Sequence, residues 1–407
     1  MGWMETCAVD ERMRFVLSIE RQDESIASAC RRFGISRKTG YKWLGRYREA
    51  GFGGLLDQSR APQHHPQAIG GRIAERCLEV RRAHPTWGPV KVRAYLERRI
   101  PVTEWPAAST IGELFDREGL TVKRKIRRRS PPSSAPFAHC EAANDVWCID
   151  FKGWFLTGDG KRCEPLTLTD AHSRYLLRCQ ALARTDTEHV WPVLDAAFRE
   201  FGLPDRMRSD NGSPFASRGA GGLSRLSVNL IKAGVTPERI APGKPQQNGR
   251  HERMHLTLLQ EVASPPASSM REQLKRLREF QRQYNDERPH QALGNATPAD
   301  CYQASARRFD GILREPQYND DRDVRRVRHN GEIKLSGNMI YVSAALVGEP
   351  IALAENEDGW TVSYGPIVLG TIAHRGDRLQ QPKRQGCGLV GNAARSPQGP
   401  QPQQQQT

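Results

Sequence analysis

The chain has 407 residues, a formal net charge of +15 and a sequence pI of about 9.6, a basic balance that favours a polyanionic partner. Its length accommodates two to four domains with at least one sizeable core. The nine scattered cysteines form no Cys-x-x-Cys pair, which argues against a zinc finger and predicts reduced thiols. The N-terminus lacks an apolar signal region, and no run of about 18 apolar residues occurs. These two features argue against a secreted protein and a membrane span, and predict a cytosolic location.

The positive charge is concentrated near the N-terminus. Residues 1–130 contain 26 Lys and Arg against 15 Asp and Glu, which is +11 of the total of +15. A nucleic-acid-binding surface is therefore expected in the first third of the chain. The alternative is an ordinary solvated basic surface.

Residues 9–50 have the pattern of a small helical domain. Apolar residues recur at helical spacing from Arg12 to Glu20, and small residues line the inner face of Ser25 to Phe33. Gly34-Ile35-Ser36 predicts a tight turn, in which Ser36 is a good N-cap for a basic helix from Arg37 to Tyr47. A glycine in the turn and basic residues at the start of the second helix are typical of a helix-turn-helix that enters a major groove. Any small three-helix bundle shares the pattern, and the net charge favours DNA binding.

A second helical unit is predicted from about Gly71 to Val122, after a linker at Ala61 to Pro66. We expect one helix from Val90 to Arg99 and another from Ile111 to Glu118, the latter capped by Ala108-Ser109-Thr110. The unit is similar to a second helix-turn-helix, with a wing as an open question.

A strongly basic segment follows this unit. Six of the seven residues from Lys123 to Arg129 are Lys or Arg, and residues 130–136 are rich in Pro and Ser. Such a segment cannot pack a core, so it predicts a flexible linker that contacts phosphates with salt-dependent affinity. A solvated linker without DNA contacts is the alternative.

Residues 145–305 alternate between strand and helix patterns. The predicted strands are Asp145–Lys152, Pro165–Thr169, Tyr175–Ala181 and Asp205–Ser209, and the predicted helices are Glu188–Phe201, Leu223–Ala233 and Gln246–Val262. In the last helix Glu252, Leu256 and Leu259 share one face, which predicts that this carboxylate lies at the rim of a packed surface. From Val324 to Ala373 five short strands separated by turns fit a small β-barrel, and the Gln/Pro-rich tail from about Gln380 is expected to be disordered.

Three acidic residues stand in distinctive local sequences. Asp150 lies in Trp-Cys-Ile-Asp-Phe, Asp210 begins Asp-Asn-Gly-Ser-Pro-Phe, and Glu252 follows Pro-Gln-Gln-Asn-Gly-Arg-His. They are 60 and 42 residues apart, too far for one calcium loop or one helix face, so only a tertiary fold brings them together. Converging carboxylates repel one another, and such a site makes physical sense with divalent cations. Mg²⁺ and Mn²⁺ prefer oxygen ligands, and a pair of them activates the attacking and the leaving oxygen of a phosphodiester.

These motifs resemble those of insertion-sequence transposases with a retroviral-integrase-type (DDE) catalytic core. Residues Pro245 to Glu252 match the spacing Pro-Gln-x-x-Gly-x-x-Glu of the loop and helix that present the integrase glutamate. The signature Tyr284-Asn285-x-x-Arg288-Pro289-His290-x-x-Leu293, followed by Thr297-Pro298, also occurs at the end of such cores. The resemblance covers residues 9–373. One departure is that helix-turn-helix units replace the His/Cys zinc domain of retroviral integrases.

The resemblance implies a multidomain fold and a reaction. We expect N-terminal all-α helix-turn-helix units, a central α/β ribonuclease-H-like core with a mixed five-stranded sheet, and a C-terminal small β-barrel. Asp150 on the first strand, Asp210 after the fourth and Glu252 on a helix would be catalytic and would bind two Mg²⁺ or Mn²⁺ ions, with Asp150 bridging them. The enzyme would cleave element DNA and join its 3′-hydroxyl to target DNA by transesterification, without a covalent protein–DNA intermediate.

The same resemblance implies the partners and the cellular site. The expected partners are DNA, as element terminal repeats and as target, and at least one further copy of the chain on DNA. No membrane partner is expected. The location is the bacterial cytoplasm, on the nucleoid. The expected DNA-binding residues are Arg37, Lys38, Lys42, Arg46, Lys123, Arg124, Lys125, Arg127, Arg128, Lys244 and Arg250.

The expected domains follow from the same patterns. They are a helix-turn-helix domain at 1–65, a second helix-turn-helix or winged-helix unit at 66–129, a Pro/Ser linker at 130–140, the integrase core at 141–305, the small barrel at 306–379 and a disordered tail at 380–407.

Two alternatives come from other functional classes. His251-Glu252-Arg253-Met254-His255 also satisfies the H-E-x-x-H motif of zinc metalloproteases, although that interpretation leaves Asp150, Asp210 and the basic helical units unexplained. A DNA-binding regulator without catalysis would treat the three carboxylates as ordinary cap and turn residues. A degenerate transposase with an altered C-terminal end is a third hypothesis.

Overall fold

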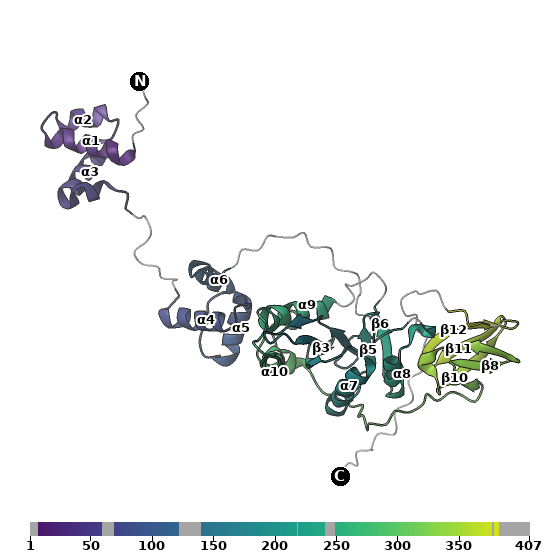
Figure 1. Ribbon diagram of the computed structural model, residues 1–407. Helices are drawn as coiled ribbons and strands as arrows, with labels where there is room; N and C mark the ends of the chain where they lie inside the picture. Colours follow the sequence, from purple (N-terminus) through teal and green to yellow (C-terminus); the bar gives the residue numbers. More distant parts are fainter. Residues whose placement is uncertain are drawn as a thin grey trace, which may run out of the picture. The chain divides into compact units, whose positions relative to one another are not determined.

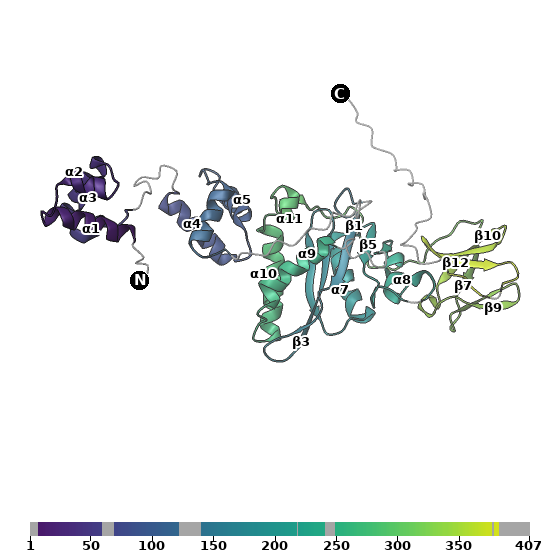
Figure 2. The ribbon, with the colours of Figure 1, turned by 90° about the horizontal axis from the view of Figure 1, so that it is seen from above.

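The computed structural model describes residues 7–58, 69–121, 140–217, 219–240, 249–376 and 378–381. It separates into two compact units, Met1–Ile69 and Gly70–Thr407 (Figures 1 and 2). The predicted DNA-contacting residues 123–125, 127, 128 and 244 lie outside the described residues, as does the tail from 382 onward. None of the described helices is both long enough and apolar enough to span a membrane.

The first unit is a helical domain with the predicted turn. Its elements are α1 (Ala8–Glu20), α2 (Ile26–Arg32), α3 (Arg37–Ala50) and the short 3-10 helix η1 (Gly51–Leu55). Ser36 caps α3 as predicted, because its side chain accepts a hydrogen bond from the Thr39 N–H at 3.1 Å. Gly34 has a φ of +65°, which a residue with a side chain rarely adopts, so glycine suits the turn between α2 and α3. Phe15, Val16 and Leu44 are buried between the helices.

The next three helices form a bundle without a wing. They are α4 (Gly71–Ala83), α5 (Pro89–Arg99) and α6 (Ala108–Arg117), and no strand occurs among the described residues 69–121. The expected cap of α6 by residues 108–110 was wrong, because the helix begins at Ala108. Its N-cap residue, Ala107, has no side-chain oxygen that could accept a hydrogen bond from the backbone N–H groups of the first turn. Trp87, in the segment between α4 and α5, is buried; it stacks on His84 and meets the Tyr95 ring of α5 edge-on.

The central part of the chain, residues 140–301, contains a mixed sheet. Its strands are β1 (Val146–Phe151), β2 (Phe155–Leu156), β3 (Arg162–Asp170), β4 (Leu176–Leu182), β5 (Arg206–Ser209) and β6 (Thr236–Arg239). The long strands run in the order β4-β3-β1-β5-β6, and the two-residue β2 pairs with the start of β3. β1 is antiparallel to β3 and parallel to β5. The predicted five-stranded mixed sheet is thus confirmed, with β2 as a short addition.

Helices cover both faces of this sheet (Figure 2). They are α7 (Thr187–Phe201), α8 (Arg225–Lys232), α9 (Gly249–Leu258), a π-helical segment (Leu259–Ala263), α10 (Met270–Asp286) and the short α11 (Pro298–Cys301), with 3-10 turns at Ala220–Gly222 and Gln291–Leu293. Residues of α7 and α8 pack on one face, and residues of α9, the π segment and α10 pack on the other.

Strand alternation decides which side chains face which helices. Trp147 and Ile149 of β1 belong to the cluster under α7 and α8, and therefore Asp150 points to the opposite face. On the neighbouring strand β3, Leu166 and Leu168 likewise face α7 and α8. Thr167 and Thr169 thus share the α9 face with Asp150.

Two elements of the core, α10 and β6, were not predicted from the sequence. α10 is highly charged, although residues 270, 274, 277, 280 and 284 have the apolar spacing of a helix. β6 contains Pro237, which argues against a strand in sequence patterns. Among the described residues, however, β6 pairs with β5 alone, and an edge strand tolerates proline.

The C-terminal part contains two antiparallel sheets. Its strands are β7 (Asp323–Arg326), β8 (Glu332–Leu335), β9 (Asn338–Tyr341), β10 (Pro350–Asn356), β11 (Gly359–Tyr364) and β12 (Ile367–Ala373), with a 3-10 turn at Ala344–Leu346. The first sheet has the order β12-β11-β10-β7, and β8 and β9 form a separate hairpin. All five predicted strands are present. The predicted closed barrel is not confirmed, because no strand pairing joins the two sheets among the described residues.

Candidate active site

Asp150 lies at the carboxyl end of β1 and is partly enclosed by the α9 face. Its side chain is 20% exposed. Burial raises the pKa of Asp150, the charge of Asp210 raises it further and Glu252 adds a smaller increase, so that the value reaches about 7. A hydrogen bond from the Phe151 N–H and the positive charge of Lys152 oppose this increase. The charges of Asp210 and Glu252 therefore both act on Asp150, as expected where carboxylates approach one another to form a cation site.

Asp210 reaches the same edge of the sheet from the strand beside β1. β5 ends at Ser209, and because β1 and β5 are parallel neighbours their carboxyl ends lie together. The Gly212 N–H donates to Asp210 Oδ1 at 3.0 Å, and a Cβ on residue 212 would lie 3.0 Å from Asp210 Oδ2. Asn211 Nδ2 donates to the Ile240 carbonyl at 2.9 Å, which ties the loop to the residue after β6. The Asp-Asn-Gly motif thus fixes the orientation of the carboxylate.

Glu252 lies in the first turn of α9, and its side chain is exposed. The helix is anchored next to it, because Arg250 Nη1 donates to the Ala171 carbonyl at 2.7 Å. The expected packed face was wrong, since Leu256 and Leu259 are 42% and 40% exposed. The buried face instead carries the two histidines of the H-E-x-x-H sequence together with residues 254 and 258.

Those histidines bind the threonine hydroxyls of β3. His251 is 1% exposed; its Nε2 lies 2.7 Å from Thr167 Oγ1 and its Nδ1 lies 2.9 Å from Thr169 Oγ1. His255 is 8% exposed, and its Nε2 also lies 2.7 Å from Thr167 Oγ1. Thr167 Oγ1 donates to the Asp150 carbonyl at 3.0 Å, so its lone pairs accept from the two imidazoles. Neutral imidazoles can thus occupy positions on the buried face of a helix, where apolar residues are usually expected.

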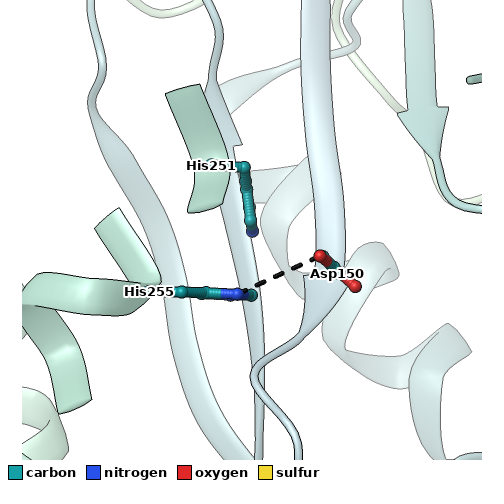
Figure 3. Close-up of side chains that lie close together, drawn as sticks. All are labelled: Asp150, His251 and His255. Atoms are coloured by element: carbon teal, nitrogen blue, oxygen red, sulfur yellow. Dashed lines mark ion pairs between the residues drawn. The ribbon is translucent and has the colours of Figure 1, made fainter. Parts of the chain in front are cut away.

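The group of Asp150, His251 and His255 in Figure 3 has the composition of a metal site, since its potential ligand atoms lie within 4.8 Å of one another. His255 Nδ1 approaches Asp150 Oδ2 at 4.0 Å, but burial lowers the pKa of His255 to about 3 and makes the imidazole neutral. Burial also lowers the pKa of His251 well below its usual value. Both ring nitrogens of His251 are engaged by threonine, which leaves it no lone pair for a cation. The arrangement therefore favours a role in holding α9 over a zinc site.

Replacing Thr167 by Val should destabilise the core, because two buried imidazoles would lose their shared hydroxyl partner. An unsatisfied buried polar group costs about 1–3 kcal/mol, and we expect the melting temperature to fall by several degrees. Thr167→Ser keeps the hydroxyl and is the matched control. Equal melting temperatures for the Val and Ser variants would contradict the hydrogen-bonded arrangement.

The predicted DNA-binding residues of the first unit lie on α3. Arg37, Lys38 and Lys42 are exposed at its start, and Arg46 is half-buried with its guanidinium over the Trp43 ring. This location agrees with a recognition helix that presents its N-terminal residues to DNA.

The comparisons with known proteins begin with domain families. Models described as integrase core domain match residues 141–245 and 233–298, a helix-turn-helix domain matches residues 11–63, and a homeodomain-like domain matches residues 39–115. The two integrase matches together include all three carboxylates.

Similar proteins occur in bacterial insertion elements. The chain is 27% identical over 285 residues to an uncharacterized 31.7 kDa protein of insertion element IS407 from Burkholderia multivorans, covering 69% of this chain and 91% of that protein. It is 28% identical over 230 residues to transposase InsD of the IS2 elements from Escherichia coli, covering 53% and 72%. Among solved structures, the catalytic core domain of BIV integrase aligns with 19% identity and a TM-score of 0.31, covering 39% of this chain and 93% of that one.

Proposed function

We propose that this chain, which belongs to the insertion-sequence transposases with an integrase-type core, cleaves the ends of its element and joins the 3′-hydroxyls to target DNA. The integrase-core and helix-turn-helix matches confirm the family expected from the acidic motifs. The single observation that supports the chemistry best is that Asp150 lies within electrostatic reach of both Asp210 and Glu252, because burial first, and then the charges of these two residues, raise the pKa of Asp150.

The donor set fits divalent cations. Three carboxylates supply oxygen ligands, which Mg²⁺ and Mn²⁺ prefer, and a cation would relieve the repulsion that raises the pKa of Asp150. We propose that Asp150, Asp210 and Glu252 hold two such ions. When bound, these ions would act as Lewis acids toward the attacking and the leaving oxygens of a phosphodiester.

The residues of the chain position the reacting groups. Asp150 is fixed on the central strand of the sheet, and Asp210 is oriented by the Gly212 N–H. Glu252 is exposed on the first turn of α9 and is therefore accessible to DNA. Lys152, close enough to affect the pKa values of Asp150 and His255, adds positive charge beside the phosphates.

The helix-turn-helix of the first unit is proposed to bind the element ends. Arg37, Lys38, Lys42 and Arg46 of α3 are the proposed contacts there, and residues 123–125, 127, 128, 244 and 250 are proposed to contact phosphates. Arg250 also anchors α9. Because two ends must be cut and joined, we propose at least a dimer on DNA, acting on chromosomal DNA in the bacterial cytoplasm.

The metal requirement tests this proposal directly. Purified full-length protein and DNA duplexes from the sequences flanking the gene should give 3′-end cleavage and strand transfer with Mg²⁺ or Mn²⁺. Chelation should abolish both reactions, and Ca²⁺, which takes more ligands at longer distances, should support binding with poor turnover. Binding without cleavage under any divalent cation would favour the non-catalytic regulator and overturn the proposal.

The zinc protease hypothesis gives opposite results. His255→Ala should leave residual DNA cleavage if His255 supports α9, whereas a zinc enzyme would lose its metal and all activity. The occupied nitrogens of His251 favour the first outcome. Zinc-dependent peptide hydrolysis by the wild-type protein would reverse this conclusion.

A further inference from the structure

The signature near the end of the core has no role in the chemistry proposed above. It runs from Tyr284 to Leu293, and two of its polar side chains are buried. Asn285 accepts from the Leu176 N–H at 2.8 Å and donates to the Leu176 carbonyl at 3.0 Å, which joins the end of α10 to β4. Arg288 is 7% exposed, and its guanidinium donates to Glu261. The signature therefore links α10 to the π segment that follows α9.

Glu261 also contacts the α4–α6 bundle. Oε1 of Glu261 accepts hydrogen bonds from both Arg288 Nη1 and Thr86 Oγ1. Because the π segment (Leu259–Ala263) continues α9 directly, Glu261 belongs to the same continuous helix as Glu252. One carboxylate thus connects the helix that carries a proposed catalytic residue to both the signature and the bundle.

The turn that presents Thr86 is held firmly. Arg81 donates to the carbonyls of Pro85, Trp87 and Leu120, each at 2.6 Å. The buried Trp87 stacks on His84, with ring centroids 3.8 Å apart. A rigid turn can transmit a displacement of the bundle to Glu261.

The charges at this contact make Glu261 the compensating group. Lys91 of α5 lies nearby. Burial, and to a smaller extent the charge of Arg288, lower the pKa of Lys91 to about 8, and Glu261 opposes this decrease. A carboxylate between two partly or fully buried cations stabilises both. Moving the bundle would therefore change the environment of Arg288 as well as that of Thr86.

A second contact holds α5 to the core. Arg98 Nη2 donates to Asp300 Oδ1 at 2.8 Å, and Arg98 Nη1 donates to Asp300 Oδ2 and, at 3.0 Å, to Thr297 Oγ1. Thr297 and Asp300 form the capping box of α11, immediately after the signature. The bundle is thus docked at two points, on the π segment and on the α11 cap.

We propose that Glu261 is a positioning residue, through which docking of the α4–α6 bundle sets the placement of the helix that carries Glu252. The inference about Glu252 rests on the proposed function, whereas the docking and its effect on α9 do not. In this scheme the α4–α6 bundle acts as a structural part of the catalytic domain. The π segment that carries Glu261 agrees with a role near the site, because π-helical turns within α-helices are frequent at functional sites.

Hydrogen exchange on the full-length protein, without DNA or metal, tests the coupling. Thr86→Val removes the hydroxyl at nearly constant shape, and amides in residues 249–263 should exchange about threefold to tenfold faster, as expected for loss of one hydrogen bond of typical net strength. Thr86→Ser should behave like the wild type. Arg98→Ala should also accelerate exchange there, whereas Arg93→Ala, which loses only an exposed pair with Glu97 on the same helix, should not. Indistinguishable exchange in the Val and Ser variants would overturn the proposal.

Kinetics separate positioning from DNA contact. At saturating donor DNA, Thr86→Val should lower the turnover of strand transfer by about threefold to tenfold, because the loosened helix positions Glu252 less often. The KM for DNA should not change. A change confined to KM would mean that Thr86 contacts DNA and would contradict the proposal. Absence of cleavage by the wild type, with the exchange difference intact, would refute the proposed function and leave the docking inference standing.

Discussion

Asp150→Asn, Asp210→Asn and Glu252→Gln should each abolish cleavage and strand transfer while leaving binding of element ends largely intact. Each replacement keeps the size of the side chain and one oxygen but removes a charge that offsets the cations. Metal-ion catalysis contributes several kcal/mol, and because about 1.4 kcal/mol is a tenfold change in rate, we expect losses of about 10³-fold or more. Single-turnover cleavage of a labelled end, measured beside its binding affinity, separates the two effects.

Glu188→Gln is the control for the glutamate. Glu188 is also exposed in the first turn of a helix, α7, so the substitution makes the same chemical change at an equivalent helix position outside the site. It should cleave at the wild-type rate. Wild-type activity of Glu252→Gln would refute the three-carboxylate mechanism, and an equal loss in Glu188→Gln would point to a general effect of charge.

Replacing Arg37, Lys38 and Lys42 together by Ala should remove the preference for element ends. These residues occupy the exposed start of α3, where a recognition helix meets the major groove. A base contact contributes about 1–3 kcal/mol, so loss of two or three should weaken specific binding by about 30-fold or more. If the residues contact phosphates instead, the slope of log affinity against log salt should decrease in magnitude by about 0.9 for each contact.

Arg48→Ala provides the comparison within the same helix. Arg48 lies in the last turn of α3 and pairs with Glu20 at 3.0 Å, so its charge is already compensated. It should bind element ends almost as the wild type does. If the triple variant retains full specificity in a salt titration by fluorescence anisotropy, α3 is not the recognition helix.

Local sequence was sufficient for several parts of the fold. The turn from Gly34 to Ser36 depends on a positive φ and a side-chain cap, both of which are properties of neighbouring residues. The same holds for Asp210, whose orientation comes from the N–H two residues later. Strands β1, β3, β4 and β5 of the core and β8 to β12 of the C-terminal part were also predicted, because strand patterns and the turns that bound them are local signals.

Other features depend on what a segment packs against. Sequence spacing placed Leu256 and Leu259 on the packed face of α9, but the threonines of β3 supply partners for His251 and His255, and the helix turns these histidines inward. The edge position of β6 explains how a strand accommodates Pro237. Such outcomes require knowledge of the neighbouring element.

The sequence by itself singled out the three acidic residues as candidates, the helix-turn-helix of the first unit and the resemblance to insertion-sequence transposases, because each is encoded in short motifs of fixed spacing. Only the tertiary structure decided that the charges of Asp210 and Glu252 act on Asp150, and that Thr86 and Arg288 share Glu261. The physical reason is that electrostatic repulsion and hydrogen bonding depend on distance in space, and residues 60 or 175 positions apart acquire such distances only when the chain folds.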